Sequence, residues 1–197
     1  MIFLASLIAP SILALARLTD MRRNDRFKIF LFYSIPTLSL WFVAYNFTPK
    51  AQFILFLFHF LWTPLIFQDM ERMLVKVFTL YTATGVSILT VILFSNNGLV
   101  LLLGAVILSI CFGLLHLLYR RIRGVAPFGL GDYPVILGLS ATLDINLFGP
   151  WIFLASVLGL TQAFVQKKSI TSRIPMIPLL FMSWQFVVGF SDFIRLI

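Results

Sequence analysis

The chain contains eight apolar segments, each about as long as the hydrocarbon core of a membrane requires, separated by short polar connections. A membrane-spanning helix needs about 20 apolar residues, with a range of roughly 17–25. Hydrophobic residues make up 60% of the 197 positions, against roughly 45–50% in a soluble domain. We therefore predict an all-α, polytopic membrane helix bundle, with helices over residues 1–18, 27–47, 51–68, 74–94, 98–118, 133–149, 150–166 and 174–194.

The sixth and seventh predicted helices, 133–149 and 150–166, are the two shortest of the set. Gly149-Pro150 lies between them, and we predict a tight turn there because proline interrupts a continuous helix. A re-entrant hairpin over the same residues is the alternative, and it would lower the number of spans. The sequence shows no repeat, linker or low-complexity segment, so we predict one continuous membrane domain.

The positive charge of the chain collects on one side of this predicted bundle. Of the 15 lysines and arginines, Lys50 and Arg195 alone fall on the opposite side. Basic loops of membrane proteins stay in the cytoplasm. We therefore predict a multi-pass protein of the cell membrane (inner or plasma membrane) with both termini outside. The net charge of +8 then indicates orientation in the lipid bilayer, and we predict no nucleic-acid partner.

Cysteine and histidine are scarce. The single cysteine, Cys111, lies inside an apolar segment, which excludes a disulfide within the chain and a cysteine-based metal site. The two histidines, His59 and His116, are far apart in the sequence, and we interpret them as neutral residues that pack at helix surfaces. The sequence therefore predicts no metal site.

The seven acidic residues are few enough to be placed one by one. Asp69 ends the third predicted helix and Asp132 begins the sixth, so we expect both at the same membrane depth on the cytoplasmic side. Their carboxylates can meet if these two helices pack together. Because an ionisable group at membrane depth is expensive to keep there, such residues mark a functional site.

Two carboxylates that lie close together cannot easily ionise together, so one keeps a proton and the other does not. An aspartyl protease uses this arrangement: the ionised carboxylate takes a proton from water, and the protonated one supplies a proton to the leaving amine. Gly129 and Gly131, just before Asp132, would let the backbone turn sharply and approach an extended substrate closely. This chemistry needs no metal and no organic cofactor.

The same two aspartates also fit purely structural roles. An aspartate at the start of a helix is usually a cap or a favourable partner of the helix dipole, and Asp132 stands at such a start. Asp69 lies among Glu71, Arg72 and Lys76 and also fits a solvated loop acid. Spacing alone leaves both interpretations open.

Three motifs together resemble a known family. Gly129-Leu130-Gly131-Asp132 resembles the GxGD motif of intramembrane aspartyl proteases, and Asp69 lies 132 − 69 = 63 positions earlier, with two apolar helices between. This order is similar to that of the type IV prepilin peptidases and the archaeal preflagellin peptidases. Ile174-Pro175-Met176-Ile177-Pro178-Leu179 also resembles the isoleucine-proline segment of that family. The resemblance covers residues 51–197 as a six-helix core, and residues 1–50 would add an N-terminal pair of helices.

The resemblance implies a membrane-embedded aspartic endopeptidase. Such an enzyme cleaves the short basic leader of a pilin-like or archaellin-like precursor at the cytoplasmic membrane face, in type IV pilus assembly or protein secretion. It implies Asp69 and Asp132 as the catalytic residues, with Gly129 and Gly131 shaping the approach of the substrate.

The sequence also departs from the family pattern. Family members usually carry lysine two residues after the second aspartate, where this chain has Pro134, and an Ile-Pro pair soon after the first, where it reads Met70-Glu71. Asp20, followed by Met21-Arg22-Arg23, is a rival first aspartate, although four predicted helices separate it from Asp132. The alternatives are a catalytically silent membrane scaffold of the same fold and a presenilin-like intramembrane protease.

Overall fold

The computed structural model describes residues 49–72, 74–124, 129–165 and 175–196. Within these ranges the chain forms six α-helices and one short 3-10 helix, η1. They are α3 (Pro49–Arg72), α4 (Val77–Phe94), α5 (Gly98–Arg123), α6 (Asp132–Ser140), η1 (Ile145–Leu147), α7 (Phe148–Val165) and α8 (Met176–Leu196). The two helices predicted at 1–18 and 27–47 lie outside the described residues, as does Asp20.

Four helices in the described ranges are long and apolar enough to cross a membrane. They cover Gln52–Met70, Val77–Phe94, Gly98–Arg123 and Ile145–Phe164. Their outer faces carry large apolar side chains, such as Phe78, Leu99 and Phe164, which are 83%, 70% and 81% exposed. Soluble monomers rarely expose apolar surface on this scale. The prediction of a helical membrane protein is therefore confirmed.

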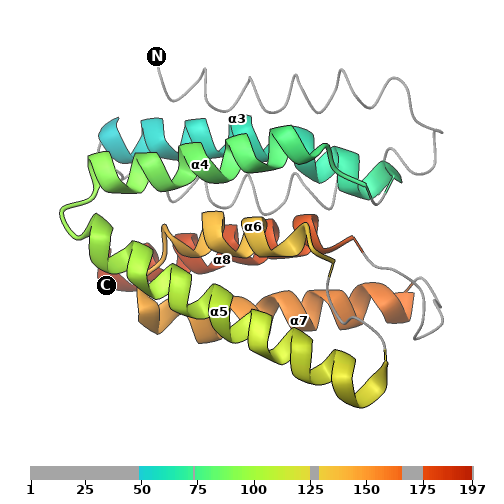
Figure 1. The fold of residues 1–197 in the computed structure, drawn as a ribbon. Coiled ribbons are helices and arrows are strands. Elements are labelled where there is room, and N and C mark those ends of the chain that lie inside the picture. Colours follow the sequence, from blue (N-terminus) through green and yellow to red (C-terminus); the bar gives the residue numbers. More distant parts are fainter. Residues whose placement is uncertain (1–48, 73, 125–128, 166–174, 197) are drawn as a thin grey trace.

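The short helix α6 lies at the centre of the bundle (Figure 1). It packs against α4, α5 and α8, and α8 packs in turn against α3 and α7. The helix α6 is buried almost throughout, with Val135, Ile136 and Leu139 at most 1% exposed. The longer helices therefore enclose α6.

A tryptophan and a glycine bring α3 close to α6. The Trp62 side chain of α3 lies so close to Gly138 of α6 that a Cβ at Gly138 would stand 2.9 Å from Trp62 Cζ2. Trp62 Nε1 also donates a hydrogen bond to Ser87 Oγ of α4 at 3.2 Å. Thr84 Oγ1 of α4 donates to the carbonyl of Pro134 in α6 at 2.9 Å. The third predicted helix therefore reaches the sixth through the Trp62 side chain, and α4 links the two by hydrogen bonds.

The prediction of a membrane-spanning helix over residues 133–149 is wrong, because the helix there is much shorter. The helix α6 has nine residues, about 14 Å at 1.5 Å per residue, and the hydrocarbon core is about 30 Å thick. The turn that follows, at residues 141–144, is held by the buried Trp184 of α8, whose Nε1 donates to Thr142 Oγ1 at 2.8 Å. Ala141 and Leu143 of this turn are at most 1% exposed, so the backbone there departs from regular helix where protein encloses it.

The tight turn predicted at Gly149-Pro150 is also wrong. Both residues lie in the first turn of α7. Proline is tolerated at that place because the first N–H groups of a helix have no acceptor within the helix. The break between the two predicted helices comes earlier, at the end of α6.

The helix α5 extends beyond its predicted end at residue 118. It continues to Arg123 and ends at Gly124, which has φ 71° and donates its N–H to the Arg120 carbonyl. Glycine suits this left-handed position because it has no Cβ to clash. Three arginines predicted in a loop, Arg120, Arg121 and Arg123, therefore belong to the last turn of a helix.

Candidate active site

Asp69 of α3 binds the start of α8. The residue lies near the C-terminal end of α3 and is 8% exposed. Its Oδ2 accepts a hydrogen bond from the Ile177 N–H at 3.0 Å, and the Met176 N–H donates to the same carboxylate. The first N–H groups of a helix lack intrahelical acceptors, and they give the helix N-terminus a partial positive charge. Asp69 is therefore a buried acid that caps a different helix.

The isoleucine-proline motif supplies the partners of Asp69. Pro175 precedes α8 and Pro178 lies in its first turn. Neither proline has an N–H, so Met176 and Ile177 provide the donors of this first turn that meet the carboxylate. The motif was visible in the sequence, but the contact was not, because it joins main-chain atoms to a side chain 108 positions earlier.

Asp132 binds the turn that precedes its own helix. Its Oδ2 accepts a hydrogen bond from the Gly129 N–H at 2.8 Å, and its own N–H donates to the Gly129 carbonyl at 3.1 Å. The two bonds close residues 129–132 into a turn at the start of α6. Asp132 therefore lies in the first turn of α6, where a carboxylate favours the helix dipole, but it does not cap the helix, because Gly131 is the N-cap residue and no side chain accepts a cap hydrogen bond there.

The two glycines of the motif do not adopt conformations that require glycine. Gly131 has φ −70° and ψ −18°, which is ordinary helical backbone. Gly124 is the one glycine with positive φ in the described ranges, so Gly129 is not in that region either. A Cβ at Gly129 or Gly131 would meet its nearest neighbour at 3.5 or 3.7 Å, an ordinary contact. The expected need for glycine in a sharp turn is wrong, while its role in substrate approach stays a prediction.

The structure places Asp69 and Asp132 within electrostatic reach of each other. The end of α3 and the start of α6 lie at the same end of the bundle (Figure 1). Burial raises the pKa of the Asp132 carboxyl from 3.8 to about 6, the Gly129 N–H opposes this rise, and the negative charge of Asp69 adds to it. The Asp69 carboxylate meanwhile accepts the N–H hydrogen bonds of Met176 and Ile177.

Pro134 stands where the family resemblance leads us to expect lysine. It is buried in the first turn of α6, and its carbonyl accepts the hydrogen bond from Thr84. The residue therefore packs α6 against α4. A lysine ammonium at this position would have to leave the helix interface to reach water, because a buried unpaired charge is costly.

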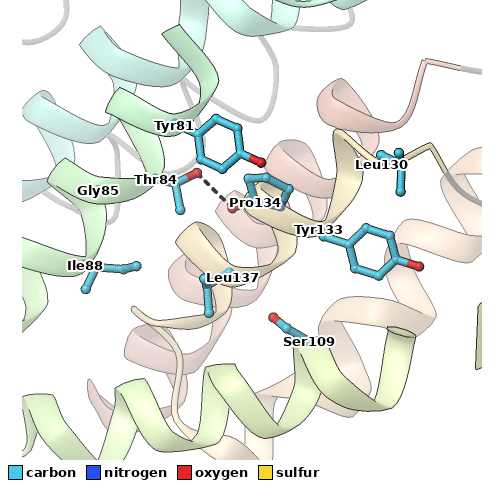
Figure 2. A pocket seen from close by; sticks show the side chains of 9 residues that line it. All are labelled: Tyr81, Thr84, Gly85, Ile88, Ser109, Leu130, Tyr133, Pro134 and Leu137. Carbon is cyan, nitrogen blue, oxygen red and sulfur yellow. Dashed lines mark hydrogen bonds between the residues drawn. The ribbon is translucent and has the colours of Figure 1, made fainter. Parts of the chain in front are cut away.

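A groove lies between α4, α5 and α6 (Figure 2). Its volume is about 420 Å³. Leu130 and Tyr133, the residues two before and one after Asp132, both line it. The remaining lining residues are Tyr81, Thr84, Gly85, Ile88, Ser109, Pro134 and Leu137.

His59 joins α3 to α8 away from the aspartates. It is completely buried, its Nδ1 lies 2.7 Å from the Leu55 carbonyl, and its Nε2 lies 2.7 Å from Gln185 Nε2. This placement agrees with its interpretation as a packing residue. Across the part of the chain that the structure describes, no three histidine, cysteine or acidic side chains are grouped so as to hold a metal ion.

Comparison of the chain with protein-family models, curated proteins and solved structures finds no match. The site is therefore defined by its own contacts. Asp69, Asp132 and the start of α8 lie at one end of a helical membrane bundle, and the groove is lined in part by Leu130 and Tyr133, which stand close to Asp132 in the sequence.

Proposed function

We propose that the protein is a membrane-embedded aspartic endopeptidase in which Asp69 and Asp132 act together on a water molecule. The observation that carries this proposal is the electrostatic interaction between two carboxylates from distant parts of the chain, which adds to the effect of burial on Asp132. The charge of Asp69 contributes to a pKa of about 6 at Asp132. A carboxyl whose raised pKa favours its protonated form, beside one that accepts N–H hydrogen bonds, forms a donor and acceptor pair suited to hydrolysis.

In this mechanism Asp69 is ionised and Asp132 carries the proton. Asp69 takes a proton from water as the water oxygen attacks the peptide carbonyl, while Asp132 donates a hydrogen bond to the carbonyl oxygen. The peptide C–N bond then breaks, and the leaving amine receives a proton from the pair. The N–H groups of Met176 and Ile177 hold the Asp69 carboxylate in place throughout.

The family resemblance supplies the proposed substrate and location. The substrate is a pilin-like or archaellin-like precursor, cleaved after its short basic leader. The active face is cytoplasmic and both termini lie outside the cell membrane. The charge distribution supports this orientation, because Arg120, Arg121 and Arg123 end α5 at the same end of the bundle as the aspartates, and cytoplasmic faces are rich in such residues.

A second candidate is a catalytically silent membrane scaffold. Both aspartates make structural contacts that favour it: Asp69 caps α8, and Asp132 closes the turn before α6. Pro134, in place of the expected lysine, also serves packing. A scaffold needs these contacts and needs no proton transfer, so an asparagine that keeps the hydrogen bonds would serve it equally well.

The test is to express the full chain with a candidate precursor and follow its processing. Asp69→Asn and Asp132→Asn should each abolish cleavage, because asparagine keeps the shape and cannot transfer the proton. Asp144→Asn is the matched control, since Asp144 is exposed and lies beyond the opposite end of α6. Its cleavage should match the wild type.

Three other outcomes would change the proposal. Cleavage that persists without Asp132 removes the mechanism. Cleavage that survives Asp69→Asn and is lost in Asp20→Asn makes Asp20 the first aspartate. Assembly that proceeds normally in both Asp69→Asn and Asp132→Asn, with no processed precursor in the wild type, establishes the scaffold.

A further inference from the structure

The groove offers an apolar surface between helices that are long enough to cross a membrane. Ile88, Leu130 and Leu137 contribute to its lining, and its walls belong to the spans Val77–Phe94 and Gly98–Arg123. The aliphatic hydroxyl groups of Thr84 and Ser109 also line it, and both are already hydrogen-bonded within the protein. Thr84 Oγ1 has the carbonyls of Leu80 and Pro134 as acceptors for its one proton, at 3.0 and 2.9 Å, and Ser109 Oγ donates to the Ala105 carbonyl. The groove therefore suits hydrocarbon.

One face of α5 leads from this groove to a pair of arginines. Ser109 lines the groove, a Cβ at Gly113 would lie 4.0 Å from the Tyr133 ring, and the His116 ring lies 5.8 Å from that ring. These positions are spaced by four and three residues, which is the spacing of one helix face. Arg120 and Arg123 continue the same spacing toward the end of the helix, and both are exposed.

Arg121 lies on a different face of the same turn. Each residue of an α-helix is rotated by about 100° from the one before it. Arg121 is therefore turned about 100° away from Arg120, although it has the same charge and is also exposed. This makes Arg121 an internal control for any role that depends on the groove.

The rim of the groove has the chemistry of a membrane interface. Tyr81, which is 61% exposed, and Tyr133 line the groove, and tyrosine is enriched at the level of lipid headgroups. Arginine side chains reach outward to that level and bind phosphate through paired N–H donors. The same positive charge repels the basic leader of the proposed substrate.

We propose that the groove binds one anionic phospholipid, with an acyl chain between α4, α5 and α6 and its phosphate on Arg120 and Arg123. A basic residue near an anionic membrane surface strengthens binding by roughly fivefold. Two arginines should therefore favour an anionic over a zwitterionic lipid by about 25-fold.

The experiment titrates the full-length protein in mild detergent with phosphatidylglycerol or phosphatidylcholine and counts bound lipid by native mass spectrometry. Arg120→Gln should weaken phosphatidylglycerol binding about fivefold, and Arg120→Gln with Arg123→Gln should remove the preference. Arg121→Gln removes one charge as Arg120→Gln does and should leave binding unchanged. Equal binding of the two lipids, or equal loss in Arg121→Gln and Arg120→Gln, would overturn the proposal.

A second pair of variants tests the groove itself. Gly85 lines the groove, and a Cβ added there would have open space around it, so Gly85→Leu is chosen to place a side chain in the groove. Gly149→Leu is the matched control, because Gly149 also has open space and lies in α7. Gly85→Leu should reduce phosphatidylglycerol binding and Gly149→Leu should not. Unchanged lipid binding in Gly85→Leu, together with slower cleavage of precursor, would assign the groove to the substrate instead.

Discussion

Asp69 and Asp132 are the same residue type at the same end of the bundle, yet the structure holds them differently. Asp69 is buried and takes its hydrogen bond from Ile177, 108 positions away. Asp132 is half-buried and takes its hydrogen bond from Gly129, three positions away. One contact joins two helices, and the other stabilises a local turn.

This difference separates what each carboxylate does for the fold. Removing the Asp69 carboxylate leaves main-chain N–H groups without an acceptor at the buried start of α8. Removing the Asp132 carboxylate frees a donor at Gly129, which is exposed to solvent. In the proposed mechanism the two residues are equal partners, whereas in the fold Asp69 matters more. Variants can therefore separate catalysis from stability.

The largest expected effect is on cleavage. Asp69→Asn and Asp132→Asn should each lower the cleavage rate by about 100-fold to 10,000-fold, the range for a lost acid or base. The double variant should be no slower than either single variant, because residues that act as one unit are not additive. Initial rates on a precursor in vesicles measure this, and multiplicative losses would show that the two carboxylates act independently.

The next effect is on stability, and it should distinguish the two residues. Asp69→Ala leaves the Ile177 N–H buried without its acceptor and should lower the free energy of unfolding by about 1–3 kcal/mol. Asp132→Ala should cost less, because water can reach Gly129. Thermal unfolding in detergent micelles measures both. Asp69→Asn is the control, since its amide oxygen can still accept the hydrogen bond from Ile177. Equal losses of unfolding free energy in Asp69→Ala and Asp132→Ala would show that the two carboxylates contribute equally to the fold.

The sequence predicts the helical segments well where a long apolar run stands alone. The predicted 74–94 and 98–118 correspond to α4 and α5, and the predicted 174–194 to α8. It fails over residues 133–149, because hydropathy does not separate a spanning helix from a short helix enclosed by other helices. The closeness of Trp62 to Gly138, which buries α6, is a tertiary contact with no local signal.

The candidate site is predictable in its residue types and not in its contacts. The order of Asp69, the GxGD motif and the proline motif indicates which segments meet. The sequence does not show that Ile177 donates its N–H to Asp69, because main-chain donors look alike in every residue except proline. For the glycines the sequence suggests more than the structure contains. The motif suggests a special backbone conformation, whereas the backbone of Gly131 is ordinary helix.

A smaller effect is expected from pH. The pKa of Asp132 is raised from 3.8 to about 6 in the folded state, so its contribution to stability is present below pH 3.8 and lost as pH rises through 6. The shift is worth no more than about 3 kcal/mol, and partial exposure reduces this to about 1 kcal/mol. As the pH rises from 4 to 7, the unfolding temperature of the wild type should fall more than that of Asp132→Asn. Parallel curves of unfolding temperature against pH would contradict a raised pKa.

The smallest effect on the fold is expected at Gly131. Because its backbone is already helical and a Cβ would meet Leu80 at 3.7 Å, Gly131→Ala should change the free energy of unfolding by less than about 0.5 kcal/mol. Gly138→Ala is the contrasting variant, since its Cβ would stand 2.9 Å from Trp62, and it should cost about 1–3 kcal/mol.

If Gly131 gives the substrate backbone access to Asp132, Gly131→Ala should slow cleavage several-fold while its unfolding midpoint stays that of the wild type. Unchanged cleavage would mean that the glycine before Asp132 serves neither the turn nor the substrate.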